Sequence, residues 1–304
     1  MKERGSPNRA LVPADIRFLV VGLIRNAEKT IVADMRRLDE VFRSFASVQY
    51  LVVESDSDDG TKEQLALLTR EIPGFRSLSL GSLRERLPKR TARISFCRNR
   101  YLHELLTNPL YSEVGYVAVV DLDGMNGLLT TDGVLSCWER DDWGVCAANQ
   151  QGPYYDVWPL RHPFWSPNDC WLHYQFLVDA GVSVKKAKEA AIYSRMVTLD
   201  PLRDWIEVES AFGGLAIYRR EVLEGVLYEG LDGQGREICE HVSLNAAILK
   251  AGYRIFINPR LINTGYTRHT RRFKKPPGIS HIMALWSAVV NHPGFHPSVR
   301  RNRS

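Results

Sequence analysis

The sequence predicts an α/β fold with a mostly parallel sheet flanked by helices, and three observations indicate it. Two apolar runs of strand length occupy residues 16–23 and 48–53. Between them, in residues 29–46, apolar residues recur at three- and four-residue steps, which marks one face of an α-helix. Strand, helix and strand in close succession form a βαβ unit, whose two strands are parallel.

The same alternation continues along the chain. Residues 61–72 are predicted as the next helix, 76–80 as a short strand, 95–106 as a helix and 116–120 as a buried strand. Residues 152–169 hold four prolines among five aromatic residues, which predicts a long loop instead of a helix or a central strand. The sequence then predicts a strand within 209–218, a helix at 239–251 and a strand at 253–257.

The composition is that of a globular protein. The 304 residues include 40 Lys+Arg and 35 Asp+Glu, and 44% are hydrophobic, which excludes a disordered, collagen-like or coiled-coil chain. No apolar run approaches the ~20 residues of a transmembrane helix, and residues 1–15 lack the apolar core of a secretory leader. The five cysteines form no C-x-x-C pair, so we expect reduced thiols in a cytoplasmic protein.

Basic charge is concentrated toward the C-terminus. No Asp or Glu follows Glu240, whereas residues 241–304 carry eleven Lys and Arg. Such a segment suits nucleic acid, an anionic bilayer surface or a phosphorylated ligand, and plain solvation is the alternative for its far end. We predict an N-terminal tail over residues 1–15, a folded domain over 16–275 and a basic extension over 276–304.

Polar residues follow three of the predicted strands. Arg25 comes after the first strand, an acidic stretch at residues 54–59 after the second, and Asp121-Leu-Asp123 after the strand at 116–120. Ligands of open α/β sheets bind beyond the carboxyl ends of the strands, so these side chains are expected to share one crevice. Two carboxylates there suit Mg²⁺ or Mn²⁺ shared with substrate phosphates, although a turn with a helix N-cap gives the same pattern.

Several stretches resemble one enzyme family. Residues 53–61, V-E-S-D-S-D-D-G-T, resemble the V-D-D-x-S-x-D-G-T element of nucleotide-sugar glycosyltransferases with the GT-A fold, most of all those of the family-2 type. Residues 22–28, 98–100, 209–220 and 239–255 resemble further elements of that family in the same order. Residues 154–161 are similar to a segment of the fungal capsule-associated mannosyltransferases, which are also of GT-A type.

The resemblance implies a GT-A, Rossmann-like domain with a nucleotide-binding half over residues 16–130 and an acceptor-side half over 131–275. It implies transfer of a sugar from a nucleoside-diphosphate sugar to a hydroxyl of a glycan or a lipid-linked acceptor, with Mn²⁺ or Mg²⁺ as cofactor. The residues that match the motifs are, for the nucleotide, Arg25, Glu54, Asp59, Arg98 and Asp121; for the metal, Asp121, Asp123 and His269; on the acceptor side, Trp158, Arg161, Gly213 and Gly214; and for catalysis, Glu240 and His241.

Some roles stay open. Inverting family members usually place a carboxylate where this chain has His241, so the base is either Glu240 or His241, or the reaction retains configuration without a base there. His269 is either a metal ligand or a solvated side chain of the basic segment. We expect no nucleic-acid partner, and peripheral membrane contact would come from the basic C-terminus.

Two other functions compete with a glycosyltransferase. A sugar nucleotidyltransferase shares a nucleotide-binding α/β sheet, but it is expected to carry a Gly-rich basic loop after the first strand, and Leu23–Glu28 is not such a loop. A non-catalytic protein that binds carbohydrate or polyanions would suit the aromatic loop and the basic C-terminus. It would not require acidic residues at the strand ends.

Overall fold

The computed structural model describes residues 15–274, in which eight strands form one sheet in the order β3-β2-β1-β4-β7-β5-β8-β6. The strands are β1 (Arg17–Ile24), β2 (Ser47–Glu54), β3 (Phe75–Ser79), β4 (Tyr116–Asp121), β5 (Val145–Gln150), β6 (Ile206–Val208), β7 (Leu215–Arg219) and β8 (Ile255–Thr264). The α-helices are α1 (Ile31–Phe42), α2 (Thr61–Glu71), α3 (Arg90–Thr107), α4 (Thr131–Leu135), α5 (Cys170–Asp179), α6 (Val184–Ala191) and α7 (Glu240–Lys250).

Most strands of the sheet run in one direction. β1 pairs in parallel with β2 and β4, β2 with β3, and β5 with β8. Only β7, between β4 and β5, and the edge strand β6 run the opposite way within residues 15–274. The predicted α/β class with a mostly parallel sheet is confirmed.

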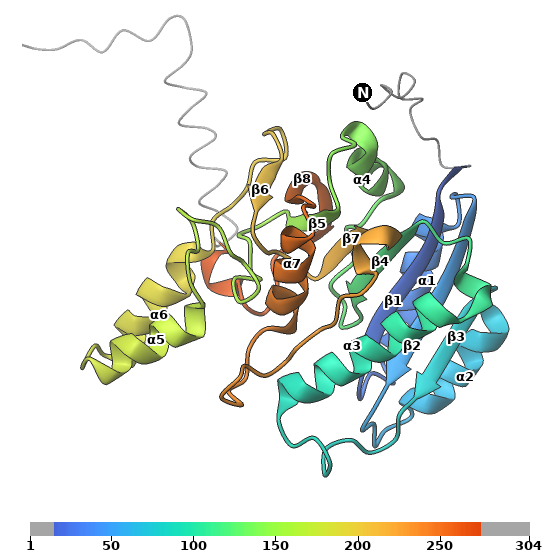
Figure 1. Cartoon of the computed structure of the whole chain (residues 1–304), viewed down its shortest axis with the longest axis horizontal. Helices are drawn as coiled ribbons and strands as arrows, with labels where there is room; N and C mark the ends of the chain where they lie inside the picture. Colours follow the sequence, from blue (N-terminus) through green and yellow to red (C-terminus); the bar gives the residue numbers. More distant parts are fainter. Residues whose placement is uncertain (1–14, 275–304) are drawn as a thin grey trace, which may run out of the picture.

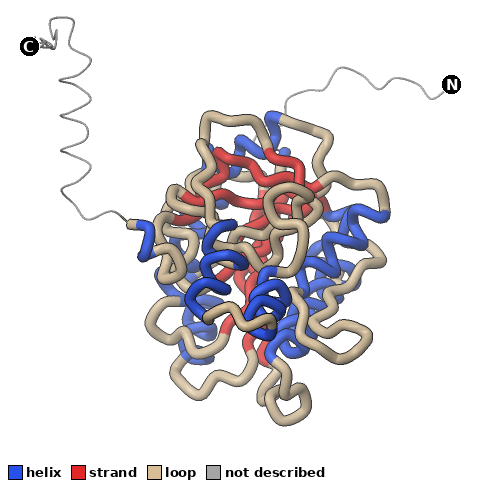
Figure 2. Tube along the Cα trace, turned by 90° about the vertical axis from the view of Figure 1, so that its left-hand side faces the viewer, coloured by secondary structure: helices blue, strands red, loops and turns tan. Residues whose placement is uncertain are grey.

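Helices cover both faces of the sheet. Side chains of β1 that point to one face pack with α1, α2 and α4, as Phe18 does with Met35 and Leu65 in one core cluster. The side chains that alternate with them point to the other face, where Leu19 belongs to the same cluster as Leu102 of α3. Leu244 of α7 lies in that second cluster too. Figure 1 shows α3 and α7 in front of the strands, and Figure 2 shows the strands enclosed between helices.

The second half adds a helical hairpin beside the sheet. α5 and α6 pack against each other and lie away from the strands in Figure 1. A third, small core cluster joins them to the long loop, with Val157, Cys170 and Ala191 buried at its centre. Residues 152–169 contain no helix and no strand longer than an isolated bridge, as the prolines predict.

The predicted elements are present with shifted ends. α3 begins at Arg90, five residues before the predicted start at residue 95, and β8 continues to Thr264 instead of ending at residue 257. The sequence patterns did not predict α4, β5, α5, α6 or β6. Within residues 15–274 no helix is both long and apolar enough to cross a bilayer. The predicted extension over 276–304 and residues 1–14 of the predicted tail lie outside the described residues.

Candidate active site

A cavity of about 490 Å³ opens at the carboxyl ends of β1, β2 and β4. The strand order changes direction here, because the chain builds outward from β1 to β2 and β3 and then returns to place β4 on the other side of β1. This is the position at which open α/β sheets bind ligands. Arg25 follows β1 on the wall of the cavity, and Asp121 and Asp123 lie at the end of β4, as predicted.

Four arginines line the cavity. Arg25 comes from the loop after β1, and Arg90, Arg93 and Arg98 come from α3. Their spacing places the three α3 residues on one side of that helix. The sequence analysis named only Arg25 and Arg98. The helical spacing of the other two could have been noticed if α3 had been predicted to begin at Arg90.

Five carboxyl groups line the same cavity, those of Asp56, Asp121, Asp123, Asp156 and Glu240. The protein raises the pKa of Asp121 to about 8, chiefly by keeping water from the carboxyl; Arg98 opposes the rise, and the carboxylates of Asp123, Asp156 and Glu240 add to it. Burial also raises the pKa of Asp156 to about 7, although the backbone N–H of Gly213 lowers it. Repulsion among these carboxylates thus adds to the effect of burial on the pKa of Asp121, and a divalent cation would relieve that repulsion.

Gly213 and Gly214 shape the cavity without lining it. Both have positive φ, +73° and +80°, which favours glycine. A Cβ would lie 2.5 Å from the carbonyl oxygen of Ala148 at Gly213, and 2.4 Å from the hydroxyl of Tyr155 at Gly214. The turn lets the Gly213 N–H donate to Oδ2 of Asp156 over 2.9 Å. The two glycines thus support a carboxyl group that the sequence analysis missed, since Asp156 lies in a loop with no regular pattern.

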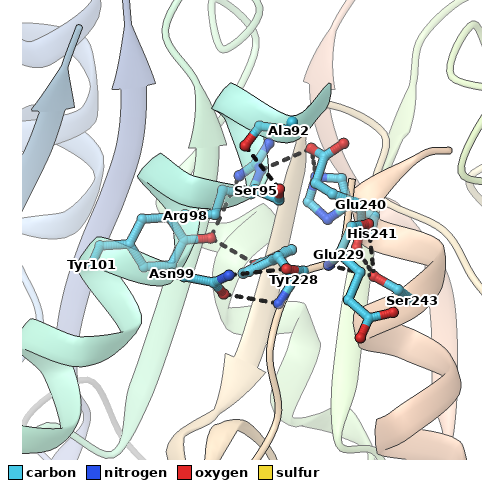
Figure 3. A network of polar contacts seen from close by, with 10 residues as sticks. All are labelled: Ala92, Ser95, Arg98, Asn99, Tyr101, Tyr228, Glu229, Glu240, His241 and Ser243. Carbon is cyan, nitrogen blue, oxygen red and sulfur yellow. Dashed lines mark hydrogen bonds and ion pairs between the residues drawn. The ribbon is translucent and has the colours of Figure 1, made fainter. Parts of the chain in front are cut away.

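A buried ion pair joins α3 to α7. Nε of Arg98 donates to Oε1 of Glu240 over 2.9 Å, and their side chains are only 6% and 7% exposed. The guanidinium lies 5.4 Å from the ring centroid of Phe212 and 5.5 Å from that of Tyr228. The hydroxyl of Tyr101 donates to that of Tyr228 over 2.7 Å, which fixes the ring in place. Figure 3 shows this network, with the second carboxylate oxygen of Glu240 turned away from Arg98.

His241 packs as an aromatic ring beside that pair. Its imidazole stacks on Phe212 with 3.9 Å between centroids, and Tyr228 contacts it edge-on. Both ring nitrogens are buried and have no hydrogen-bond partner in the described structure. Burial, together with the charge of Arg98, holds the pKa of His241 well below its usual value. The imidazole is therefore held in its neutral form, and its protonation by an acceptor hydroxyl is disfavoured.

Glu54 and Asp59 are not among the residues that line the cavity, whereas Ser55 and Asp56 of the same stretch are. Glu54 is fully buried at the end of β2, where its carboxylate accepts the backbone N–H of Ser57 over 2.9 Å and the hydroxyl of Ser79. Asp59 accepts the backbone N–H of Glu28 over 3.2 Å and so ties the loop after β1 to the loop after β2. Both carboxylates position these loops, and direct contact with a nucleoside stays a prediction.

On the acceptor side, Trp158 lines the cavity but Arg161 does not. Arg161 donates to Oδ2 of Asp169 over 3.1 Å and to the carbonyl of Trp158 over 2.7 Å. Its hydrogen bonds therefore stabilise the long loop that carries Trp158. A direct contact between Arg161 and an acceptor stays a prediction.

The predicted three-residue metal site is not assembled in the structure. The ring of His269 stacks on Tyr155, and its Nε2 accepts Nε of Arg268 over 3.1 Å. Burial lowers the pKa of His269, although the nearby charge of Asp123 opposes that shift. In residues 15–274 no three His, Cys, Asp or Glu side chains converge as metal ligands do. Two carboxylates, Asp121 and Asp123, remain at the cavity, and Mg²⁺ is commonly held by one or two carboxylates together with substrate phosphates and water.

The chain matches no protein-family model and none of the curated proteins. Among solved structures it is similar to a mannosyltransferase from Pyrobaculum calidifontis in complex with GDP-Man and Mn²⁺, with 14% identity, a TM-score of 0.48, and 91% of this chain and 65% of that chain covered. It is also similar to S. aureus TarS 1-349 in complex with UDP-GlcNAc, with 13% identity, a TM-score of 0.46, and 91% of this chain and 68% of that chain covered.

A third similar structure is glucosyl-3-phosphoglycerate synthase from Mycobacterium tuberculosis in complex with Mn²⁺, UDP and phosphoglyceric acid, with 16% identity and a TM-score of 0.40. The match covers 90% of this chain and 76% of that chain. Of the mannosyltransferase, by comparison, the chain spans 65% of the length. At these identities the likeness concerns the fold, so the function is inferred from the cavity itself.

Proposed function

We propose that the chain is a metal-dependent glycosyltransferase that moves a sugar from a nucleoside-diphosphate sugar to a hydroxyl group. The observation that carries this proposal is the cavity at the point where the strand order changes direction, whose lining has two charged parts, the arginines and the carboxylates of Asp121 and Asp123. A diphosphate matches both parts: arginines bind its oxygens directly, and a divalent cation bridges it to the carboxylates.

Asp121 and Asp123 are the residues that would hold Mn²⁺ or Mg²⁺. The pKa of Asp121 is raised chiefly by burial and further by Asp123, Asp156 and Glu240, and a bound cation would relieve the repulsion among these carboxylates. When bound, the cation supplies charge stabilisation of the departing diphosphate. Phosphate oxygens and water would complete its ligands, since these two side chains are too few on their own.

The arginines would bind the rest of the diphosphate. Arg25 and Arg90 are exposed on the cavity wall, and neither forms an ion pair within residues 15–274. Both are therefore free to bind phosphate oxygens, which guanidinium groups do in a bidentate way. Nε of Arg98 binds Glu240, and a direct contact between Arg98 and the nucleotide stays a prediction.

Glu240 is the residue that we place at the acceptor hydroxyl. The ion pair with Arg98 fixes one of its oxygens, and the other points away from Arg98 in Figure 3. That oxygen would receive the proton of the attacking hydroxyl, as general bases do. Trp158, on the same cavity, offers an apolar ring surface against which a sugar could pack. A glycan and a lipid-linked sugar both present such a hydroxyl.

Donor turnover in the full chain tests the proposal. A panel of nucleoside-diphosphate sugars is incubated with Mn²⁺, with Mg²⁺ or with EDTA, and released nucleoside diphosphate is measured with and without acceptors. We expect turnover only with metal, and Asp123→Asn to lower it by at least about 100-fold because a metal ligand is lost. Asp132→Asn, which changes an exposed acid in the first turn of α4, is the matched control and should act as wild type.

Turnover that persists in EDTA would remove the metal from the proposal. Calorimetric binding of nucleoside diphosphate without any turnover on the panel would retain the donor site and exclude the sugars tested. Absence of both binding and turnover would contradict the proposed function itself.

A further inference from the structure

The hairpin of α5 and α6 exposes an apolar face that no other element covers within residues 15–274. On α5, Trp171, Leu172 and Phe176 are 46%, 56% and 66% exposed, and Leu172 and Phe176 lie one turn apart. Val184 at the start of α6 is 52% exposed. Exposed apolar side chains usually occur singly on a protein surface, and a group of them on one element marks an interaction surface.

Positive charge lies on the second helix of the hairpin. Lys185, Lys186 and Lys188 all lie on α6. The acid that follows them, Glu189, is paired with Arg272 over 2.9 Å. On α5, the one acidic residue is Asp179, in the last turn. The hairpin therefore combines exposed apolar side chains with a net positive charge.

The chain leaves the described structure next to this hairpin. Phe273 contacts the ring of Tyr193, which follows α6, and the description ends at Lys274. Residues 275–304 carry four further Lys and Arg, no Asp or Glu, and an apolar run at 282–290. Their charge has the same sign as that of α6, so it complements an anionic partner and not the hairpin.

We propose that the α5–α6 hairpin docks on an anionic lipid bilayer. The apolar face of α5 would enter the boundary between headgroups and acyl chains, and the lysines of α6 would meet anionic headgroups. Tryptophan is favoured at that boundary. A second copy of the chain is a poorer occupant, because it would bring two sets of lysines together. The hairpin lies on the bilayer and does not cross it, since neither helix is long enough.

Asp169 links this surface to the cavity. Its Oδ1 accepts the backbone N–H groups of Trp171 and Leu172 over 2.8 and 3.1 Å, which caps α5. Its Oδ2 accepts the indole N–H of Trp158 over 2.9 Å, and Trp158 lines the cavity. A docked hairpin would thus keep the acceptor side of the cavity near the bilayer. If the proposed function holds, the acceptor is then a lipid-linked sugar; the docking itself does not depend on that function.

Flotation of the full chain with vesicles tests the docking. The vesicles contain phosphatidylcholine alone, or phosphatidylcholine with 30% phosphatidylglycerol, at about 0.1 M salt. We expect binding to the anionic vesicles only, reduced by at least tenfold in Leu172→Ser/Phe176→Ser. Lys185→Glu/Lys186→Glu should reduce it too, on the order of fivefold for each lysine lost. The matched control is Leu110→Ser/Leu227→Ser, which removes two leucines that are 55% and 63% exposed outside the hairpin and should bind as wild type.

Three results would overturn the proposal. One is equal binding by wild type and the Leu172→Ser/Phe176→Ser variant. Another is complete loss of binding on truncation after Lys274 while the hairpin variants bind normally, which would assign the contact to residues 275–304. The third is a dimer in light scattering that Leu172→Ser/Phe176→Ser abolishes, with no vesicle binding by wild type. Unchanged thermal unfolding of the variants shows that they fold, and vesicle binding without sugar transfer would refute only the proposed function.

Discussion

Replacing Arg98 by methionine should destabilise the protein through the charge that it leaves behind. Arg98 and Glu240 are 2.9 Å apart, and both side chains are almost fully buried. Without the guanidinium, the carboxylate of Glu240 would share the cavity with Asp121 and Asp156 and would lack its ion-pair partner. Breaking a buried ion pair in this way costs about 3–5 kcal/mol. Because Glu240 also lines the cavity, which admits water, we expect the lower end, about 3 kcal/mol.

A double-mutant cycle measured by urea unfolding in EDTA checks this reasoning. For a domain of this size, 3 kcal/mol corresponds to a fall in Tm of about 6–12 °C. Glu240→Gln removes the charge, so the Arg98→Met/Glu240→Gln double variant should be less destabilised than the sum of the single variants by at least about 1 kcal/mol. Arg100→Met, which breaks an exposed pair with Glu104 on the same helix, should cost under about 1 kcal/mol. A coupling energy near zero would show that the ion pair with Arg98 does not stabilise the buried carboxylate of Glu240.

Two further predictions concern the carboxyl groups and the glycine turn. The folded-state pKa values of Asp121 and Asp156, about 8 and about 7, lie above the ordinary value of 3.8, so the folded chain binds more protons than the unfolded chain between those limits. Their contribution to stability is present at low pH and is lost as the pH rises through 7 to 8. Urea unfolding in EDTA should therefore show falling stability from pH 6.5 to 8, and Asp121→Asn should flatten the decline; an unchanged slope in that variant would contradict the assignment. Gly214→Ala should lower Tm and donor turnover, because its Cβ would collide with Tyr155, and a wild-type Tm would refute the strain.

The sequence alone predicted the part of the site that depends on local pattern. β1, β2 and β4 are short apolar runs, and parallel strands place their carboxyl ends at one edge. The residues directly after two of them, Arg25 and Asp121, consequently meet in the cavity. The position of Glu240 in the first turn of α7 was predicted as well, because the spacing of apolar residues indicates where that helix begins.

The part of the site that the sequence did not predict depends on contacts between residues far apart in the chain. Asp156 reaches the cavity because the Gly213 N–H, 57 residues later, binds its carboxylate. The Gly-Gly turn lies there because β7 runs antiparallel to β4, a reversal that no local pattern of apolar residues indicates. The pKa of Asp156 likewise depends on how deeply the finished fold buries it. Such groups could be found only after the strand order was known.

The charge balance of the cavity also bears on the order of binding in the proposed reaction. A diphosphate that enters without metal meets the carboxylates of Asp121 and Asp123 along with the arginines. A cation that enters without diphosphate has two protein carboxylates for ligands, and the raised pKa of Asp121 means that a proton must leave first. Each partner thus supplies charge that the other lacks, so each should raise the affinity for the other by the same factor. On this reasoning the metal and the nucleoside diphosphate should bind as a pair. The acidic residues weaken the binding of a donor that carries no metal, and they thereby select a metal-bound donor.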